Sequence, residues 1–248
     1  MQSARLIQLA AGHAVENMSI DQALLEITGN TRVPTLRLYT WCEPTLSLGY
    51  FQKRGDRQTH QDSLSIDAVR RSTGGGAIVH HHELTYSLFL PIEPTSGSQR
   101  RLYSQVHKVI AAALKAFGVT AVPFRMLGQS TSDSPNDPFL CFQRRTDEDL
   151  IVSGYKILGS AQRKSRGAVL QHGSLLLRSS PWSPQLPGIG ELTGHFIPVA
   201  EIADRVSKGI AKRMGWDWEP HPISTEERKH AERISESKFG SPQWYERR

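Results

Sequence analysis

Segments with helical spacing of apolar residues alternate with short β-rich segments along most of the chain. Helices are predicted over residues 17–28, 101–117 and 199–214, where apolar side chains recur on one face. Strands are predicted over 35–41 and on both sides of a glycine run within 69–90. Because strand and helix patterns follow one another, the sequence predicts an α/β fold with a mixed, largely antiparallel central sheet flanked by helices.

Glycine and serine residues mark the expected ends of several helices. Gly29 and Gly118 directly follow the first two helical segments, and glycine is common just past a helix C-terminus. Ser224 and Glu227 form a capping-box pattern, which predicts a polar helix that ends near Gly240.

The size of the chain favours one compact unit. It has 248 residues, of which 38% are hydrophobic, so it can bury a sizeable core. No internal repeat, low-complexity tract or long linker occurs, which favours a single domain over 1–248 with a C-terminal helical tail from about residue 224. No apolar run approaches the roughly 20 residues of a membrane-spanning helix, and residues 1–9 lack the basic-then-apolar layout of a secretory signal, so a cytoplasmic protein without membrane contact is expected.

The net charge indicates which binding partners to expect, and the cysteine count limits which disulfide or metal sites the chain can form. The net charge of +6 and the pI of about 9.5 suggest an acidic partner, either nucleic acid or an acidic carrier protein. Two cysteines are too few for a disulfide framework or a four-thiolate zinc site. Cys42 lies in a strand-like run and is predicted to pack in the core.

Cys141 lies in a proline-rich segment, residues 134–141, which is predicted to be irregular. Catalytic groups are often displayed on such loops. The neighbouring Arg144 and Arg145 are cationic, and positive charge favours the nucleophilic thiolate over the thiol. A passive loop cysteine is the alternative.

Three consecutive glycines, Gly74 to Gly76, follow Arg70 and Arg71. A loop without side chains lets backbone N–H groups approach a carbonyl, thioester or phosphate closely, but the same run also suits a tight turn. No Gly-Lys-Ser or Gly-Lys-Thr follows, so the run is not a Walker-type phosphate loop.

Three histidines come next. On a strand, His80 and His82 would point to one face and His81 to the other. These histidines have three alternative roles, which are metal binding, contact with a substrate and simple solvent exposure. No further pair of closely spaced ligands completes a metal site, so none is expected.

Two hairpins are predicted over 150–177, with turns at Ser153-Gly154 and at 165–167. Lys156 lies between small residues that leave room for a ligand, and its ammonium could hold an acyl oxygen as negative charge develops there. An exposed strand lysine is the alternative. Residues 171–174 are polar within an otherwise apolar strand and need hydrogen-bond partners or a cavity.

Taken together, these segments resemble the lipoate protein ligase and octanoyltransferase superfamily, whose catalytic core is similar to that of biotin protein ligases and to class II aminoacyl-tRNA synthetases. The resemblance covers nearly the whole chain, and its blocks occur in order with sensible spacing. The matching blocks are residues 16–25, 36–41, 47–52, 70–80, 83–87, 154–162 and 170–174.

Within the superfamily, the chain most resembles octanoyltransferases that load the glycine cleavage H protein, because Cys141 lies in the loop before the lysine hairpin. The resemblance implies that Cys141 takes octanoyl from acyl carrier protein as a thioester and passes it to a lysine of a lipoyl-type acceptor, while Lys156 steadies the acyl carbonyl. It implies no cofactor. The residues implied in substrate binding are Arg71, Gly74, Gly75, Gly76, His80, Gly159, Ser160, Ala161, His172 and Gly173. The implied docking charges for the acidic carriers are Arg100, Arg101, Arg144, Arg145, Arg163, Lys164 and Arg166.

Two alternatives remain. An ATP-dependent lipoate protein ligase, with ATP and magnesium, would use the same glycine loop and Lys156; the chain ends soon after Trp244, without room for the accessory domain that many such ligases carry. A non-catalytic acyl-carrier-binding protein is the second alternative, since His81 stands where the superfamily usually has aspartate. This departure leaves the base that activates Cys141 open among His80, His81 and His172.

Overall fold

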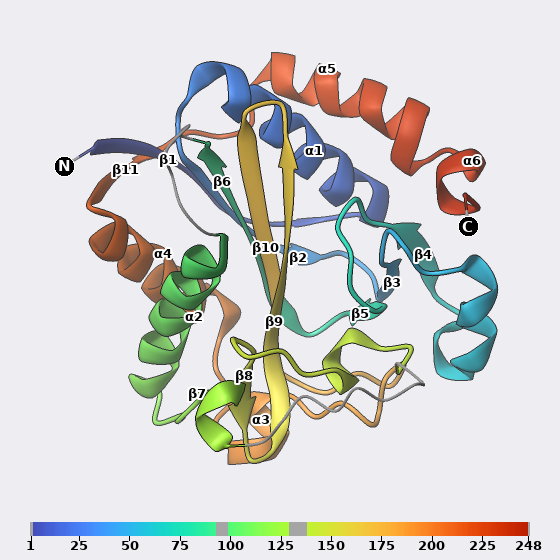
Figure 1. The fold of residues 1–248 in the computed structure, drawn as a ribbon, viewed down its shortest axis with the longest axis vertical. Helices are drawn as coiled ribbons and strands as arrows, with labels where there is room; N and C mark the ends of the chain where they lie inside the picture. The colour runs from blue at the N-terminus through green and yellow to red at the C-terminus, as the bar shows by residue number, and fades with distance from the viewer. Residues whose placement is uncertain (1, 93–98, 129–137, 248) are drawn as a thin grey trace.

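A computed structural model describes residues 2–92, 99–128 and 138–247. Its largest element is an eight-stranded sheet in the order β11-β1-β2-β6-β10-β9-β8-β7 (Figure 1). β1 pairs in parallel with β11 and β2, whereas the pairings from β2 across to β7 are antiparallel, so the predicted mixed, largely antiparallel sheet is confirmed. The strands are β1 (Gln2–Gly12), β2 (Thr35–Trp41), β6 (Glu83–Pro91), β7 (Val122–Pro123), β8 (Leu150–Val152), β9 (Tyr155–Ser165), β10 (Ala168–Leu176) and β11 (Trp216–Pro220).

Helices cover both faces of this sheet. α1 (Ala14–Thr31) packs on one face with α5 (Thr225–Ile234) against it, and α2 (Gln99–Lys115) and α4 (Val199–Met214) cover the other face (Figure 1). Side chains of β2 alternate accordingly: Leu36 and Leu38 join the core under α2 and α4, and Tyr39 and Trp41 join the core under α1. The sheet is therefore buried on both faces.

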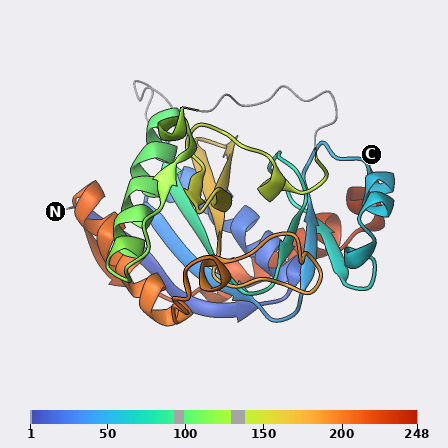
Figure 2. The same ribbon diagram turned by 90° about the horizontal axis from the view of Figure 1, so that it is seen from below.

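A second sheet has the order β4-β3-β5 and lies on the side of the molecule away from α2 and α4 (Figure 2). Its strands are β3 (Thr45–Leu48), β4 (Asp67–Arg70) and β5 (Ile78–His80), and the glycine run connects the last two. The remaining short elements are η1 (Arg54–Thr59), η2 (Gln61–Ser63), η3 (Phe124–Leu127), η4 (Cys141–Gln143), α3 (Ile189–Thr193), η5 (Ser235–Phe239) and α6 (Pro242–Tyr245).

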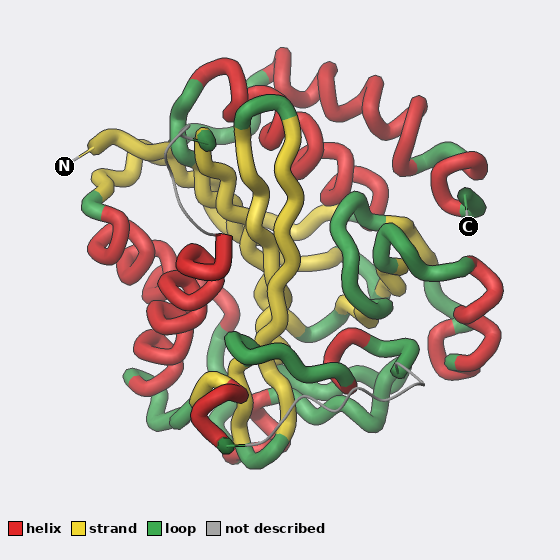
Figure 3. The backbone as a smooth tube through the Cα atoms, in the orientation of Figure 1, coloured by secondary structure: helices red, strands yellow, loops and turns green. Residues whose placement is uncertain are grey.

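The two predicted hairpins are confirmed. β8, β9 and β10 are joined by turns at Ser153-Gly154 and Arg166-Gly167, and Figure 3 shows β9 and β10 as long neighbouring strands with a short loop between them. All four turn residues have positive φ, from 47° at Arg166 to 81° at Gly154. Two consecutive positive φ values define the turn that matches the twist of a hairpin.

Predicted helix ends have mixed outcomes. Ser224 caps α5 by accepting a hydrogen bond from the Glu227 backbone N–H, as predicted. Gly29 does not end α1, which continues to Thr31 and is followed by Arg32 at a φ of 61°. A Cβ on Gly29 would lie 1.9 Å from the Arg166 carbonyl oxygen, so this glycine permits close packing of α1 against the β9–β10 turn.

Two further predictions are wrong. β5 ends at His80, and His81 and His82 lie in a bend before β6, so these three side chains do not alternate along one strand. Cys42 follows the end of β2 and is exposed rather than packed in the core. Within the described ranges, none of the helices has both the length and the apolarity needed to cross a bilayer.

Candidate active site

A cavity of about 290 Å³ opens where β9 and β10 meet the glycine run and the Cys141 loop. The structure brings most of the predicted site residues to it. The cavity is lined by Met18, Tyr39, Trp41, Arg71, Gly74, Gly75, Ile78, His80, Thr85, Tyr103, Cys141, Phe142, Gly159, Ser160, Ala161, Gln162, His172, Gly173 and Ser174. Its wall is mainly apolar and aromatic, and polar groups enter it from β6, β9 and β10 and from Arg71 and His80.

Cys141 begins η4 and is held in place by the end of the glycine run. Its backbone N–H donates to the Ala77 carbonyl over 2.8 Å, and the Ala77 N–H donates to the Phe139 carbonyl over 2.9 Å. A Cβ on Gly76 would lie 2.8 Å from the Cys141 nitrogen, so this close approach requires glycine. Cys141 is half-buried and lines the cavity. Residues 134–137 of the predicted proline-rich segment lie outside the described residues.

Lys156 is buried, with 4% of its surface exposed, so the exposed-lysine alternative is wrong. Its Nζ lies 3.9 Å from the Cys141 Sγ and donates to the Cys141 carbonyl over 3.3 Å. It forms an ion pair with Asp149 over 2.8 Å. Lys156 does not itself line the cavity, but a Cβ on Gly159 would lie 2.8 Å from Nζ, so the small residue on β9 leaves space for the ammonium.

Arg71 ties the glycine run to β3. Its two terminal nitrogens donate to the carbonyl oxygens of Ser47, Gly74 and Gly76 over 2.7 to 2.9 Å. A Cβ on Gly75 would lie 3.1 Å from the Arg71 Nη2 and 3.8 Å from the Cys141 Sγ, so guanidinium and thiol flank the same point of the loop. Burial lowers the pKa of Arg71 to about 10, so it stays charged at neutral pH.

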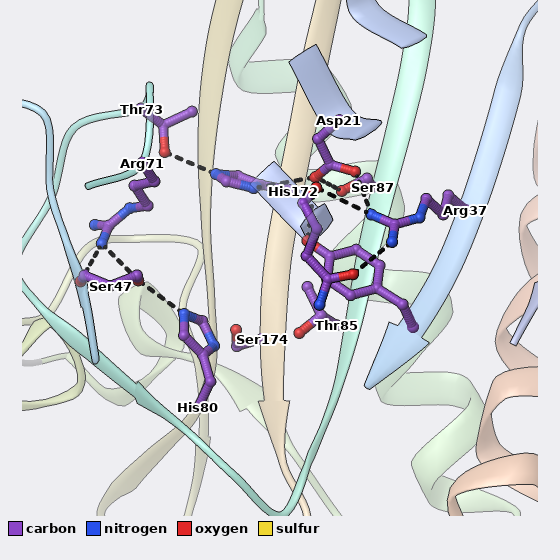
Figure 4. Close-up of polar contacts among 12 residues, drawn as sticks. Asp21, Arg37, Ser47, Arg71, Thr73, His80, Thr85, Ser87, His172 and Ser174 are labelled. Atoms are coloured by element: carbon purple, nitrogen blue, oxygen red, sulfur yellow. Dashed lines mark hydrogen bonds and ion pairs between the residues drawn. The ribbon is translucent and has the colours of Figure 1, made fainter. Parts of the chain in front are cut away.

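His80 supports the cavity wall. Its ring nitrogens form hydrogen bonds of 2.7 Å with Ser47 and Glu83 (Figure 4 shows the bond to Ser47), and the ring stacks on Trp41 at a centroid distance of 3.9 Å. Both nitrogens are therefore engaged away from Cys141.

His172 lies on β10 between the glycine run and a buried carboxylate. Its Nε2 forms a hydrogen bond of 2.7 Å with Thr73, and its Nδ1 lies 3.8 Å from Asp21 (Figure 4). Burial lowers the pKa of His172, although Asp21 opposes this, so the ring is neutral at neutral pH. His81 does not line the cavity: its ring packs beside His82 at 3.5 Å and meets Trp182.

Sequence reasoning missed the carboxylate beneath His172. Asp21 on α1 pairs with Arg37 over 2.7 Å and accepts a hydrogen bond from Ser87 (Figure 4). It also accepts a hydrogen bond from the Tyr39 hydroxyl. Burial alone would raise the pKa of Asp21, but Arg37 and the hydrogen bonds hold it below the usual value. Asp21 directly follows Ile20 and so lies beside the apolar face of the predicted helix, where a single acidic residue carries no motif.

A second missed group lies on the α2 side. His107 is buried, and its Nε2 forms a hydrogen bond of 2.7 Å with Ser160, which also bonds Tyr86 over 2.7 Å. These contacts fix the cavity-lining Ser160. His107 was not singled out because a lone histidine in an amphipathic helix carries no motif.

Several of the arginines expected to dock acidic carriers form hydrogen bonds or ion pairs within the chain. Arg145 donates to the Phe142 carbonyl, Arg163 donates to the Ser72 carbonyl, and Arg166 pairs with Glu26. The side chain of Arg100 lies outside the described residues. Among the residues that the structure describes, no cluster of three or more histidine, cysteine or acidic side chains is arranged to hold a metal ion.

Comparisons with known proteins identify the family. Residues 13–217 match the lipoyl protein ligase A/B catalytic domain. The octanoyltransferase LipM of Kyrpidia tusciae is 31% identical, with 98% of each chain covered, and that of Geobacillus kaustophilus is 30% identical, with 92% of each chain covered. A bi-partite lipoate protein ligase from Thermoplasma acidophilum, solved in a study that includes its E2 lipoyl domain, shares the fold with a TM-score of 0.77 at 18% identity, covering 99% of this chain and 96% of that one.

The family match spans most of the chain, and the octanoyltransferase relatives align with nearly its full length. The chain therefore belongs to the lipoyl protein ligase A/B catalytic domain family and is an octanoyltransferase, an enzyme of the acyltransferase class.

Proposed function

We propose that this octanoyltransferase moves octanoyl from acyl carrier protein to a lysine of a lipoyl-type carrier, such as the glycine cleavage H protein, through a thioester on Cys141. One observation carries the proposal: the Cys141 thiol lines an apolar cavity, and the Lys156 ammonium lies 3.9 Å from its sulfur. A nucleophile beside a fixed positive charge, at the edge of a pocket for a hydrocarbon chain, suits covalent acyl transfer.

In the first step, the Cys141 thiolate attacks the carbonyl carbon of the octanoyl thioester. The bond between that carbon and the carrier's sulfur breaks, and the carrier leaves as a thiolate, which takes up a proton from solvent. Lys156 and Arg71 both lie close to this sulfur. Lys156 stabilises the negative charge that develops on the carbonyl oxygen.

In the second step, the neutral amine of the acceptor lysine attacks the acyl-Cys141 carbonyl carbon. An amide bond forms, the carbon–sulfur bond breaks, and the amine releases a proton while Cys141 is regenerated as a thiolate. The thioester donor is already activated, so the proposed reaction uses no ATP, metal ion or other cofactor. A cytoplasmic location, where both carriers would be met, is part of the same proposal.

The ATP-dependent ligase is the competing function, because Lys156 and the glycine run also suit adenylate chemistry. Cys141 separates the two: a ligase has no use for a thiol at the mouth of the acyl cavity. A non-catalytic carrier-binding protein is not retained, because the chain is an acyltransferase.

The test is to incubate the enzyme with octanoyl-acyl carrier protein, without ATP, and to measure the mass of the intact protein. We expect one octanoyl adduct that is lost in Cys141→Ala and then transferred to added H protein. Cys42→Ala is the matched control, because Cys42 is exposed and does not line the cavity; it should keep the adduct. Activity that persists in Cys141→Ala and needs ATP with free lipoate would establish the ligase instead.

A further inference from the structure

The turn before β8 presents a buried carboxylate to the reactive centre. The Asp149 side chain accepts the Thr146 backbone N–H over 2.7 Å, and the Asp149 N–H donates back to the Thr146 carbonyl over 3.0 Å. The Asp149 carbonyl accepts the Phe124 N–H over 2.8 Å. These local bonds fix the carboxylate independently of any substrate.

The same carboxylate holds Lys156. The ion pair measures 2.8 Å, with side-chain exposures of 3% for Lys156 and 4% for Asp149. Lys156 also donates to the carbonyl oxygens of Cys141 and Arg144 over 3.3 and 3.4 Å, so its contact with Asp149 is the shortest of these three. Asp149 is the acidic side chain paired with Lys156 in the described part of the chain.

We propose that Asp149 is a positioning residue, which holds the Lys156 ammonium charged and aimed at the sulfur and the acyl oxygen on Cys141. This inference rests on the proposed function, the covalent relay in which octanoyl is carried as a thioester on Cys141. A buried ammonium without a counter-charge loses its proton or turns toward solvent. Asp149 supplies this counter-charge at 2.8 Å, and the pairing along β8 and β9 limits the movement of Lys156.

Other groups around the pair do not replace this carboxylate. Tyr103 and His107 approach from α2: burial, with the charges of Asp149 and Cys141, raises the pKa of Tyr103 to about 12, and burial lowers that of His107, so both are neutral at neutral pH. Arg145 is cationic and donates to the Phe142 carbonyl. The neighbouring Glu148 pairs with Arg125 instead.

The test is the rate of acyl-Cys141 formation in a single turnover with saturating octanoyl-acyl carrier protein. Asp149→Asn keeps the shape and an acceptor for Thr146 but removes the charge, and should slow this step by about 100-fold, as expected when a reacting group is misplaced. In Asp149→Asn, the rate of acyl-Cys141 formation should begin to decrease at a lower alkaline pH than in the unaltered enzyme, because the Lys156 ammonium has lost its counter-charge. Glu148→Gln, the matched loss of an adjacent carboxylate, should change neither.

A double-variant comparison separates positioning from a general structural role. If Asp149 acts through Lys156, then Asp149→Asn combined with Lys156→Met should be no slower than Lys156→Met alone, within about twofold. Should Asp149→Asn fail to fold, Asp149→Glu keeps the charge but moves it by one methylene, and we expect it to slow the same step.

Failure of this inference is distinguishable from failure of the proposed function. An unaltered enzyme that forms no acyl-Cys141 contradicts the covalent relay. An enzyme that forms it, while folded Asp149→Asn reacts as fast with the same pH profile, or while the effects of Asp149→Asn and Lys156→Met add, overturns the role of Asp149 alone.

Discussion

The hairpin that carries Lys156 and the loop that carries Cys141 are held in different ways. β9 is paired on both sides, with β8 and β10, and its two turns are adjacent in sequence to the strands they join. Cys141 is held by its backbone N–H, which donates to the carbonyl oxygen of Ala77, a residue of the distant β4–β5 connection, beside the bridge between Leu140 and Ala77. The ammonium is thus positioned by local strand pairing, and the thiol by long-range hydrogen bonds with Ala77 that depend on the close approach at Gly76.

Removing the charge on the hairpin should have the largest effect. Lys156→Ala leaves Asp149 buried without its partner, so we expect a loss of about 3–5 kcal/mol in the free energy of unfolding, together with about 100-fold slower acyl transfer.

Denaturant unfolding of Lys156→Ala and of Lys156→Met/Asp149→Asn tests this account. The double variant, which replaces the ion pair by neutral groups, should recover stability without recovering activity. Equal stability of Lys156→Ala and the unaltered enzyme would contradict the burial argument.

A side chain at Gly76 should obstruct the close contact that holds the Cys141 loop and so displace this loop. Gly76→Ala places a methyl group 2.8 Å from the Cys141 nitrogen and 2.9 Å from the Phe139 carbonyl oxygen, so backbone must shift. We expect about 1–3 kcal/mol of lost stability and a displaced thiol, seen as slower acyl-enzyme formation.

Gly154→Ala is the matched hairpin control for the loop variant. Nothing lies within 4 Å of its added methyl group, and only its φ of 81° is unfavourable. It should cost about 1–2 kcal/mol and leave the rate of acyl transfer unchanged. If Gly154→Ala slowed acyl transfer as much as Gly76→Ala, the proposed difference between hairpin and loop would not hold.

The smallest effect concerns pH and the packing of α2 against β9. Burial lowers the pKa of His107 below 6.5, so the unfolded chain binds more protons as the pH falls below this value. The free energy of unfolding should therefore be highest above pH 6.5 and fall on acidification, by at most about 1.4 kcal/mol per pH unit for this group.

Thermal unfolding between pH 7 and pH 5 measures this dependence. His107→Gln, which removes the titrating ring, should show a smaller decrease in melting temperature than the unaltered protein. His221→Gln, at an exposed position, serves as the control. An identical pH dependence in His107→Gln and the unaltered protein would exclude the proposed linkage.

Local features of the sequence determined the hairpins, the strand over Thr35–Trp41, α4 and the cap at Ser224, because turn residues and apolar spacing act over a few positions. The resemblance of ordered blocks indicated the family and the pairing of Cys141 with Lys156. These features depend on neighbours in sequence, so the sequence alone was enough to predict them.

Tertiary structure alone decided which buried groups meet. Asp149 with Lys156, Asp21 beneath His172, and Gly29 against Arg166 are contacts between separate elements. From the sequence, Gly29 was predicted to end a helix and His80 to His82 were predicted to alternate along a strand. Only the packing of the elements shows what these residues contact. The physical reason is that burial and charge pairing are properties of three-dimensional neighbours, which spacing along one chain does not specify.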